Sequence, residues 1–417
     1  MNNKIIAGAV AAAVIGMSPI TASAINFKDV MAGKADFSIG GYLKLNAINS
    51  DYSAGDVADT TGGNAFYFPG RIPTDVDGGG AGSGENSDDL DFSAQESRIN
   101  FKVSQKIDGH SLLGYLEIDF MPVSGAGTAG NEIISNSTNP RLRHAFFKFD
   151  NWLFGQTWST YMDVGSLPES VDFLAASESV VFNRQPQIRY TSGAFQIALE
   201  NPEAFNNGGT DRDDSDLPDL TANYTMKGDF GHVRLSGLLR EVVDIRLATA
   251  ATAATPATST ALATLATPAI PATDESEIGY GIGLTGKFNV GKDDLKYSFQ
   301  YGEGLGRYVG LALPADGTVD ANGDLNLSTT TAFTLAYRHW WTDKVRSSLI
   351  YSDLDVDYDS AVPVTSTSSS ESITVNLMYS PVKNVTLGVM YLYAERELDN
   401  GEDGNLTRLH ASAKYAF

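Results

Sequence analysis

Apolar residues recur at every second position along most of this chain, and that periodicity limits its folds more than any other feature. The last ten residues, 408–417, read Arg-Leu-His-Ala-Ser-Ala-Lys-Tyr-Ala-Phe, so that apolar and mostly polar positions alternate. A period of two places successive side chains on opposite faces of a β-strand. The pattern therefore predicts a series of strands, each with one apolar face and one polar face.

Segments of this kind recur about sixteen times, and most approach the ~10 residues with which a tilted strand crosses a bilayer. Short and long connections alternate between them. The short ones fall at 108–109, 150–151, 192–193, 228–229, 290–294, 342–343 and 381–384, and the long ones at 50–92, 122–139, 159–185, 202–218, 242–277, 303–327, 356–369 and 397–405. Outer-membrane barrels have short periplasmic turns and long extracellular loops. The sequence therefore predicts an all-β fold, a transmembrane antiparallel β-barrel of about sixteen strands.

A soluble two-sheet sandwich is the alternative, because its strands would also alternate. A sandwich does not require connection lengths to alternate, however. Aromatic residues also cluster near the predicted strand ends, where a barrel would place them at the membrane interfaces. These residues are Trp152, Trp158, Tyr337, Trp340, Trp341, Tyr391, Tyr393, Tyr415 and Phe417. Both features favour the membrane barrel.

The N-terminus predicts export. Residues 1–24 contain a lysine, an apolar run and a closing Ala-Ser-Ala, which together are typical of a cleaved signal peptide. Residues 25–35 would then form a short periplasmic segment and residues 36–417 the barrel, in a Gram-negative outer membrane. Within the barrel, residues 242–277 contain a low-complexity Ala/Thr/Pro stretch and are expected to form a surface loop.

Charge and motifs exclude other classes. The chain has 51 acidic and 29 basic residues and a net charge of −22, which argues against nucleic acid as a partner. The motifs H-E-x-x-H and G-x-S-x-G are absent, and neither G-x-G-x-x-G match (125–130 and 281–286) opens a helix in a βαβ unit. We therefore expect no enzyme and no cofactor. A hydrolase with catalytic residues on separate strands is the alternative.

Four stretches are more specific than a strand pattern. They are RLRHAFFKF (141–149), LFGQTWSTYMD (153–163), DFLAASESVVFNRQPQIRYT (172–191) and ALENPE (198–203). In this order they resemble the DcaP-like porins, outer-membrane channels of Gram-negative bacteria. The resemblance implies a sixteen-stranded barrel that forms a homotrimer in lipid and favours small anions such as dicarboxylates. That family often carries a coiled-coil extension, whereas here only residues 25–36 precede the first predicted strand.

Basic residues recur on the face that should point inward. Arginine presents a planar fork that matches a carboxylate, so a cluster of arginines in a channel would favour anions. The candidates for pore lining and solute binding are Arg98, Lys102, Arg141, Arg143, Arg184 and Arg189. The alternative is that these residues pair with acids such as Glu96, Glu117 and Asp119 and only hold the wall. The facing of 141–149 stays open, because Arg141, Arg143, Phe147 and Phe149 fall on one face of a regular strand.

The long connection at 159–185 is the candidate constriction loop. It follows the fifth predicted strand, where general porins fold a loop into the lumen, and it mixes apolar with acidic residues. The alternative is a loop that caps the barrel from outside. The sequence alone leaves both arrangements open.

Acidic residues concentrate in the other long loops. Oxygen-rich clusters suit Ca²⁺ or Mg²⁺, and weak divalent-cation clusters are conceivable at Asp211, Asp213, Asp214, Asp353, Asp355 and Asp357. The alternative is a solvated acidic surface.

These features predict a porin for passive diffusion of small hydrophilic solutes, with a preference for negatively charged molecules such as dicarboxylates. Two alternatives remain. One is a non-selective or cation-leaning porin whose acidic loops set the field at the mouth. The other is a surface-binding barrel that acts through those loops.

Overall fold

The computed structural model of the chain describes residues 33–55, 57, 65–74, 87–121, 136–174, 176–206, 215–246, 273–320, 322–358, 362–363 and 366–417. The predicted signal peptide, 1–24, and most of the predicted segment 25–35 lie outside these ranges. The first strand begins at Ala35, one residue before the predicted start of the barrel. Within the described ranges, no helix is both long and apolar enough to span a membrane.

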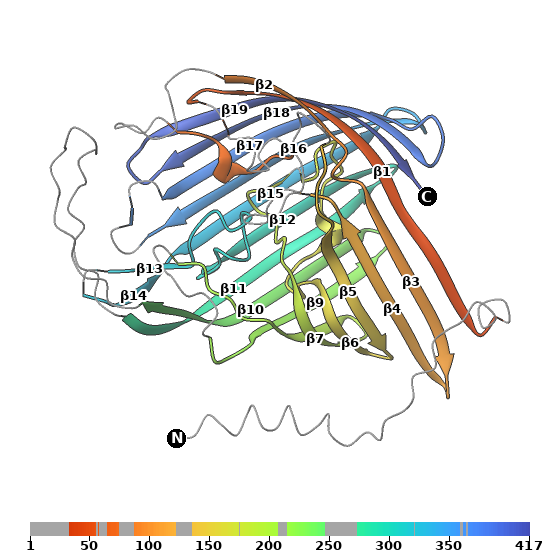
Figure 1. Cartoon of the computed structure of the whole chain (residues 1–417), viewed down its shortest axis with the longest axis horizontal. Helices are drawn as coiled ribbons and strands as arrows, with labels where there is room; N and C mark the ends of the chain where they lie inside the picture. The colour runs from red at the N-terminus through yellow and green to blue at the C-terminus, as the bar shows by residue number, and fades with distance from the viewer. Residues whose placement is uncertain are drawn as a thin grey trace.

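Strands dominate the described chain (Figure 1). They are β1 (Ala35–Tyr52), β2 (Ser87–Ser93), β3 (Arg98–Ile107), β4 (His110–Asp119), β5 (Arg141–Phe149), β6 (Trp152–Trp158), β7 (Arg184–Ser192), β8 (Phe195–Glu200), β9 (Asp219–Gly228), β10 (Gly231–Arg246), β11 (Thr273–Val290), β12 (Asp293–Glu303), β13 (Gly317–Val319), β14 (Leu325–Leu327), β15 (Thr329–Trp340), β16 (Val345–Asp357), β17 (Thr367–Tyr379), β18 (Val385–Leu398) and β19 (Asp403–Ala416). Two short 3₁₀ helices are η2 (Pro69–Arg71) and η3 (Val164–Ser166).

The main sheet contains 17 of these strands and closes on itself, because β1 pairs with β19. On its other edge, β1 pairs with β2 along Asn46–Tyr52 and with β3 along Ala35–Tyr42. The two short partners therefore fill one position in the wall. The result is a closed antiparallel barrel of 16 positions, as the sequence predicted. Strands β13 and β14 form a separate hairpin in the connection from β12 to β15.

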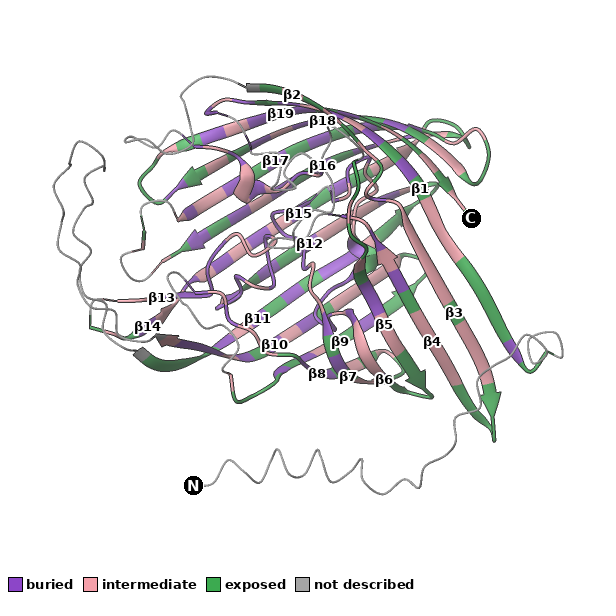
Figure 2. Cartoon of the chain, in the orientation of Figure 1, coloured by how far each residue is buried: buried purple, intermediate pink, exposed green. Residues whose placement is uncertain are grey.

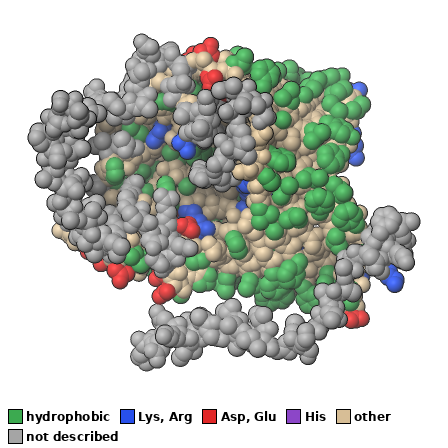
Figure 3. Space-filling model, viewed as in Figure 1, with side chains coloured by type: hydrophobic (Ala, Val, Ile, Leu, Met, Phe, Trp, Pro, Cys, Tyr) green, Lys and Arg blue, Asp and Glu red, His purple; other side chains and the backbone are tan. Residues whose placement is uncertain are grey.

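The wall has the polarity of a barrel that meets lipid. In β17, Val375 and Leu377 are exposed, and Asn376 between them is buried. In β19, Leu409 is 57% exposed whereas His410 is 2% exposed. Buried and exposed residues alternate along the strands in Figure 2, and hydrophobic side chains cover much of the outer wall in Figure 3. A soluble sandwich would bury the apolar face instead, so that alternative is wrong.

Gly41 lies where the two ends of the sheet meet. Its amide donates to the carbonyl of Phe417 at 3.2 Å, and the Phe417 amide donates back at 3.1 Å. The φ angle of Gly41 is +146°, and a Cβ there would lie 2.2 Å from the Arg98 carbonyl oxygen. Only glycine fits at this point, because its missing Cβ lets three strands approach.

A β-bulge settles the facing of residues 141–149. Glu117 pairs with His144 and Ile118 pairs with Leu142, which leaves Arg143 as an extra residue on β5. A bulge shifts the alternation of the strand by one residue. Arg143 therefore faces inward and is 2% exposed, whereas Phe147 beyond the bulge faces outward. In a regular strand Arg143 and Phe147 would share one face, and the bulge removes this conflict by placing them on opposite faces.

Several predicted loops were too wide. Strand residues occupy both ends of the predicted loops 50–92, 356–369 and 397–405. Strand β10 continues to Arg246 and β11 begins at Thr273, so strand residues occupy both ends of the predicted surface loop 242–277. The intervening residues, 247–272, lie outside the described ranges. Strand β7 begins at Arg184, so the predicted loop 159–185 ends at residue 183.

Candidate functional site

Residues 159–174 and 176–183, between β6 and β7, lie against inward-facing side chains of the wall, and we call this segment the inner loop. Asp163 anchors its start. One carboxylate oxygen accepts a hydrogen bond from the Gly165 amide at 2.9 Å and so caps η3. The other oxygen is 2.8 Å from Nε2 of His232 on β10 and accepts from Thr285 on β11 at 3.0 Å. A single acid thereby ties the loop to two strands.

Glu169 fixes the middle of the inner loop to the far wall. Arg338 on β15 donates to its carboxylate at 2.8 Å, and Arg346 on β16 donates at 2.5 Å through Nη2 and 2.8 Å through Nε. The Glu169 carbonyl also accepts from Asn376 on β17 at 3.0 Å. Burial would raise the pKa of the Glu169 carboxyl, but the bonds from Arg346 and Arg338 outweigh it and lower the pKa to about 2. Glu169 is therefore ionised and paired.

The tip of the inner loop binds residues 65–74, which we call the first-loop segment. The amide of Tyr67 donates to Asp172 at 3.0 Å, and Ser177 donates to the Tyr67 carbonyl at 3.0 Å. The Tyr67 hydroxyl donates to the Glu178 carboxyl. Three bonds to one residue join the two segments, and a fourth from Lys44 to the Val171 carbonyl at 2.6 Å joins the tip to β1.

The two acids at the tip differ in ionisation. Burial raises the pKa of Asp172, but His410 on β19 lies 3.5 Å away and helps to bring the pKa below its usual value. Burial also raises the pKa of Glu178, and here the bond from Tyr67 offsets only part of that effect, so the pKa is about 7. The second carboxyl oxygen of Glu178 has no hydrogen-bond partner among the described residues.

Apolar packing fills the space between the inner loop and the wall. Leu305, Tyr308 and Val309, in the connection after β12, are each 0% exposed. They form a buried cluster with residues of the inner loop and of β10, β15 and β16, namely Tyr161, Met162, Val181, Leu238, Ala332, Leu354 and Val356. Residues of the first-loop segment form a second cluster with β17, β18 and β19.

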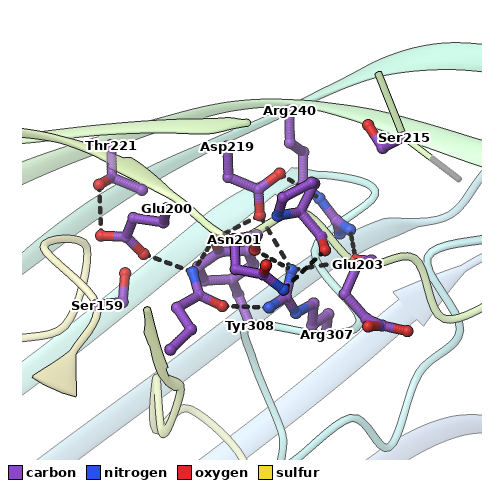
Figure 4. A network of polar contacts seen from close by, with 12 residues as sticks. Ser159, Glu200, Asn201, Glu203, Ser215, Asp219, Thr221, Arg240, Arg307 and Tyr308 are labelled. Carbon is purple, nitrogen blue, oxygen red and sulfur yellow. Dashed lines mark hydrogen bonds and ion pairs between the residues drawn. The ribbon is translucent and has the colours of Figure 1, made fainter. Parts of the chain in front are cut away.

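A polar network anchors residues 304–316 to the neighbouring strands (Figure 4). The Tyr308 hydroxyl donates to Asp219 on β9 at 2.7 Å. Arg240 on β10 is 2.6 Å from Asp316. Gln185 on β7 donates to the Tyr308 hydroxyl at 2.8 Å. These bonds satisfy buried charges that would otherwise be costly. This connection is therefore part of the barrel interior rather than a free surface loop.

The packing leaves one side of the interior accessible at the level of the inner loop. Arg408, Ser352 and Thr374, which face inward from β19, β16 and β17, are each 0% exposed. Arg98 on β3 and Arg141 on β5 keep side-chain exposures of 18% and 21%. The side of the interior that carries β3–β5 is therefore accessible to solvent. In Figure 3, Lys and Arg side chains are visible in the hollow of the face shown.

Three of the predicted arginines meet on that side. Arg141 donates from Nε and Nη2 to the two oxygens of Asp119, at 2.8 and 2.7 Å. Arg143 donates to Glu117 at 2.7 Å and to Asp119 at 2.8 Å, and Arg98 lies 3.5 Å from Glu117. Three guanidinium groups thus share two carboxylates. The sequence-based alternative, that lumen arginines pair with Glu117 and Asp119, is correct for these three arginines.

Arg184 completes this group, which we call the arginine cluster: Arg98, Arg141, Arg143 and Arg184. The Phe173 ring of the inner loop lies within 6.0 Å of the first three guanidinium carbons. The Trp158 ring lies 5.7 Å from that of Arg143 and 4.9 Å from that of Arg184. The cluster therefore combines cationic groups with aromatic faces, which attract cations.

The remaining two candidates lie outside the cluster. Lys102 is exposed on β3, nearer the turn at 108–109. Arg189 donates to the Trp158 carbonyl and, at 2.9 Å, to the side chain of Gln187, so it holds the backbone where the inner loop begins. Sequence reasoning missed Tyr67 and Arg346, because their partners lie more than 100 residues away in the chain.

The predicted cation clusters gain no geometric support. Asp353, Asp355 and Asp357 lie on the outward face of β16, and Asp211, Asp213 and Asp214 lie outside the described ranges. Among the residues that the structure describes, no three acidic or histidine side chains converge on a point that could hold a metal ion.

Comparisons with known proteins agree with this architecture. A family model described as DcaP outer membrane protein matches residues 69–417. The outer membrane channel DcaP of Acinetobacter baumannii is 22% identical, with a TM-score of 0.71 over 92% of this chain and 98% of that chain. OmpT of Vibrio cholerae is 12% identical, with a TM-score of 0.52 over 92% of this chain and 98% of that chain. No curated protein matches the chain by sequence.

Proposed function

Because the chain belongs to the DcaP outer membrane protein family, we propose that it forms a channel that favours small, negatively charged solutes such as dicarboxylates. The family and the fold establish the coarser part of this statement. The protein is a porin of the Gram-negative outer membrane and not an enzyme. The solute preference is our inference from the interior.

The charge balance of the arginine cluster carries the proposal. Four guanidinium groups lie together with only two acidic partners, Glu117 and Asp119, among the described residues. Three acids of the inner loop have partners elsewhere: Glu169 and Asp163 bind the opposite wall, and Asp172 lies 3.5 Å from His410 on β19. The field at the cluster is therefore positive, although the whole chain carries a charge of −22. A passing anion is stabilised there, and its binding is weak enough for release.

A cavity of about 960 Å³ lies beside the turns at 108–109 and 150–151. Three lysines and three aspartates line it, namely Lys34, Lys106, Lys148, Asp36, Asp108 and Asp150. Because these charges balance, the cavity adds nothing to the positive field of the arginine cluster.

The inner loop is the proposed constriction. Its contacts with β10, β15, β16 and β17 fix it in the interior, and its Phe173 ring reaches the arginines of β3 and β5. Removing those contacts should widen the channel. A loop that capped the barrel from outside would not contact inward-facing side chains of so many strands.

The test is the reversal potential of the purified protein in a planar bilayer under a KCl gradient, repeated with succinate on one side. Anion selectivity together with block by succinate supports the proposal. Cation selectivity without block would favour the acidic loops as the source of the field and would overturn it. Absence of conductance would favour a surface-binding barrel.

We also propose that the protein is a homotrimer. The family resemblance implies this state, and a structure of OmpT from Vibrio cholerae is described as a trimer form, with 12% identity and a TM-score of 0.51. Light scattering of the detergent-solubilised protein, corrected for bound detergent, measures the state directly. A monomer mass under conditions that keep the barrel folded would contradict this proposal.

A further inference from the structure

A polar cavity of about 310 Å³ lies beside the arginine cluster, at the extracellular ends of β5–β7. It is lined by Leu142, Gln156, Phe182, Asn183, Arg184, Gln185 and Arg307. This volume corresponds to roughly ten water molecules and lies at the lower limit of typical ligand sites. Two of the lining side chains are cationic and none is acidic.

The cavity lies where the wall stops pairing. Strand β6 pairs with β5 only as far as Ala145–Gln156, although it pairs with β7 up to Trp158–Arg184. The bulge at Arg143 lies two residues before Ala145, the last residue of β5 that pairs with β6. Gln156 bridges the parted strands by donating to the carbonyls of Leu142 and Arg143, both at 3.4 Å. The cavity is thus a product of the same bulge that turns Arg143 inward.

Arg184 differs from the other members of the cluster. Arg141 and Arg143 each donate to acidic groups, whereas the Arg184 guanidinium makes no hydrogen bond and no ion pair with any residue in the described ranges. Its contacts are with aromatic faces, Trp158 at 4.9 Å and Phe182 at 5.2 Å. The rings hold the guanidinium plane but supply no hydrogen-bond acceptor in that plane.

A second donor beside Arg184 is also unsatisfied. The side-chain nitrogen Nδ2 of Asn183 and Nη1 of Arg184 are both shielded from solvent, and neither has an acceptor within the part of the chain described. Arg307 is engaged, because it donates to Gln185 and lies 3.2 Å from Asp219. Shielded donors without acceptors are rare in native proteins. A rotation of either side chain into the cavity would let a ligand supply the acceptor.

We propose that this cavity binds the carboxylate of a small organic anion, with Arg184 and Asn183 as its hydrogen-bond donors. A carboxylate offers two coplanar oxygens to a guanidinium fork, and a charged partner makes such bonds strong. The site would hold the solute on the extracellular side before it reaches Arg141 and Arg143. The inference rests on the proposed anion preference, and it assigns recognition to the one arginine of the cluster that pairs with no acid within the described ranges.

The test is calorimetric titration of the detergent-solubilised protein with succinate at low salt, with the neutral diamide succinamide as the control ligand. We expect R184Q to weaken succinate binding at least about tenfold, because charged hydrogen bonds are lost. R184K should give an intermediate loss, since lysine keeps the charge without the fork. K102Q is the control. It removes one positive charge from β3 but no member of the arginine cluster and no residue that lines the cavity, and should weaken binding by less than about threefold.

R184Q should fold, because the guanidinium makes no hydrogen bond to any described residue and its contacts with Trp158 and Phe182 are its main local support; heat-modified mobility on SDS gels checks this. Equal losses in R184Q and K102Q would overturn the site in favour of a diffuse field. An anion-selective channel that binds no succinate in the titration would also overturn the site, while leaving the proposed function standing. A cation-selective channel would overturn the proposed function, even if binding that depends on Arg184 persisted.

Discussion

Glu178 should make the protein less stable as the pH rises from acid to neutral. This carboxyl lies at the tip of the inner loop, is 0% exposed and has a pKa of about 7 because burial opposes its charge. The value in an unfolded chain is near 4.5. When the folded-state pKa lies above the unfolded value, the folded state holds the proton more tightly. The stabilisation is complete below about pH 4.5 and is lost as the pH rises through about 7.

The size of the effect follows from the difference between the two pKa values. A gap of about 2.5 units, at 1.36 kcal/mol per unit, corresponds to about 3 kcal/mol in the free energy of unfolding. The amide in Glu178→Gln cannot ionise but can still accept the hydrogen bond from Tyr67. The variant should therefore lack this pH dependence and be more stable than the wild type at pH 8 by up to about 3 kcal/mol.

The assay is urea unfolding of both proteins in detergent from pH 4 to pH 8.5, followed by tryptophan fluorescence. The quantity to compare is the free energy of unfolding of the wild type minus that of Glu178→Gln at each pH. The contributions of all other titrating groups are the same in both proteins and cancel in this difference. Tyr67→Phe is the control. Tyr67→Phe removes the hydroxyl that donates to the Glu178 carboxylate. Without that bond the pKa of Glu178 should rise further, so the free energy of unfolding should depend more strongly on pH. A difference between wild type and Glu178→Gln that does not change with pH would refute the reasoning.

Three further perturbations test other parts of the structure. Glu169→Gln should release the inner loop from two arginines and raise single-channel conductance and current noise; unchanged conductance would contradict a constriction role. Gly41→Ala should impair closure and cost about 2 kcal/mol or more, measured by urea unfolding, whereas Gly114→Ala, where an added Cβ meets nothing within 4 Å, should cost little. Val375→Arg places a charge on the lipid face and should reduce the free energy of folding into lipid vesicles by roughly 2–4 kcal/mol; no loss would mean that this face does not meet lipid.

The wall was predictable from the sequence because its information is local. Apolar and mostly polar residues alternate along 408–417, and the structure places Leu409 outside and His410 inside as that alternation requires. The number of positions in the barrel followed from the same pattern. Only the departures from regularity were missed. The bulge at Arg143 is invisible to a period of two, because either register of 141–149 leaves some residue on an unfavourable face.

The filling of the interior was not predictable, because it depends on contacts between distant segments. Tyr67 and Glu178 are separated by 111 residues, and Arg346 and Glu169 by 177. Neither the spacing nor the local composition marks these residues as partners. The sequence did indicate that 159–185 could fold inward, from its position after the fifth strand and its mixed character. The side of the lumen that the loop fills depends on its partners on the wall, such as Arg338 and Arg346 for Glu169.

The arginine cluster shows why residue type alone could not rank the candidates. Arg141, Arg143 and Arg184 were equivalent in the sequence, yet the first two share Asp119 whereas Arg184 has no acidic partner among the described residues. A paired arginine mainly stabilises the wall, because its donors are already used. An unpaired one retains its full capacity for a passing anion. Exposed charges act over only about 8 Å at physiological salt, so the nearest unpaired group matters more than the net charge of −22. Selectivity in this channel should therefore follow the pairing of individual arginines, which only the folded barrel reveals.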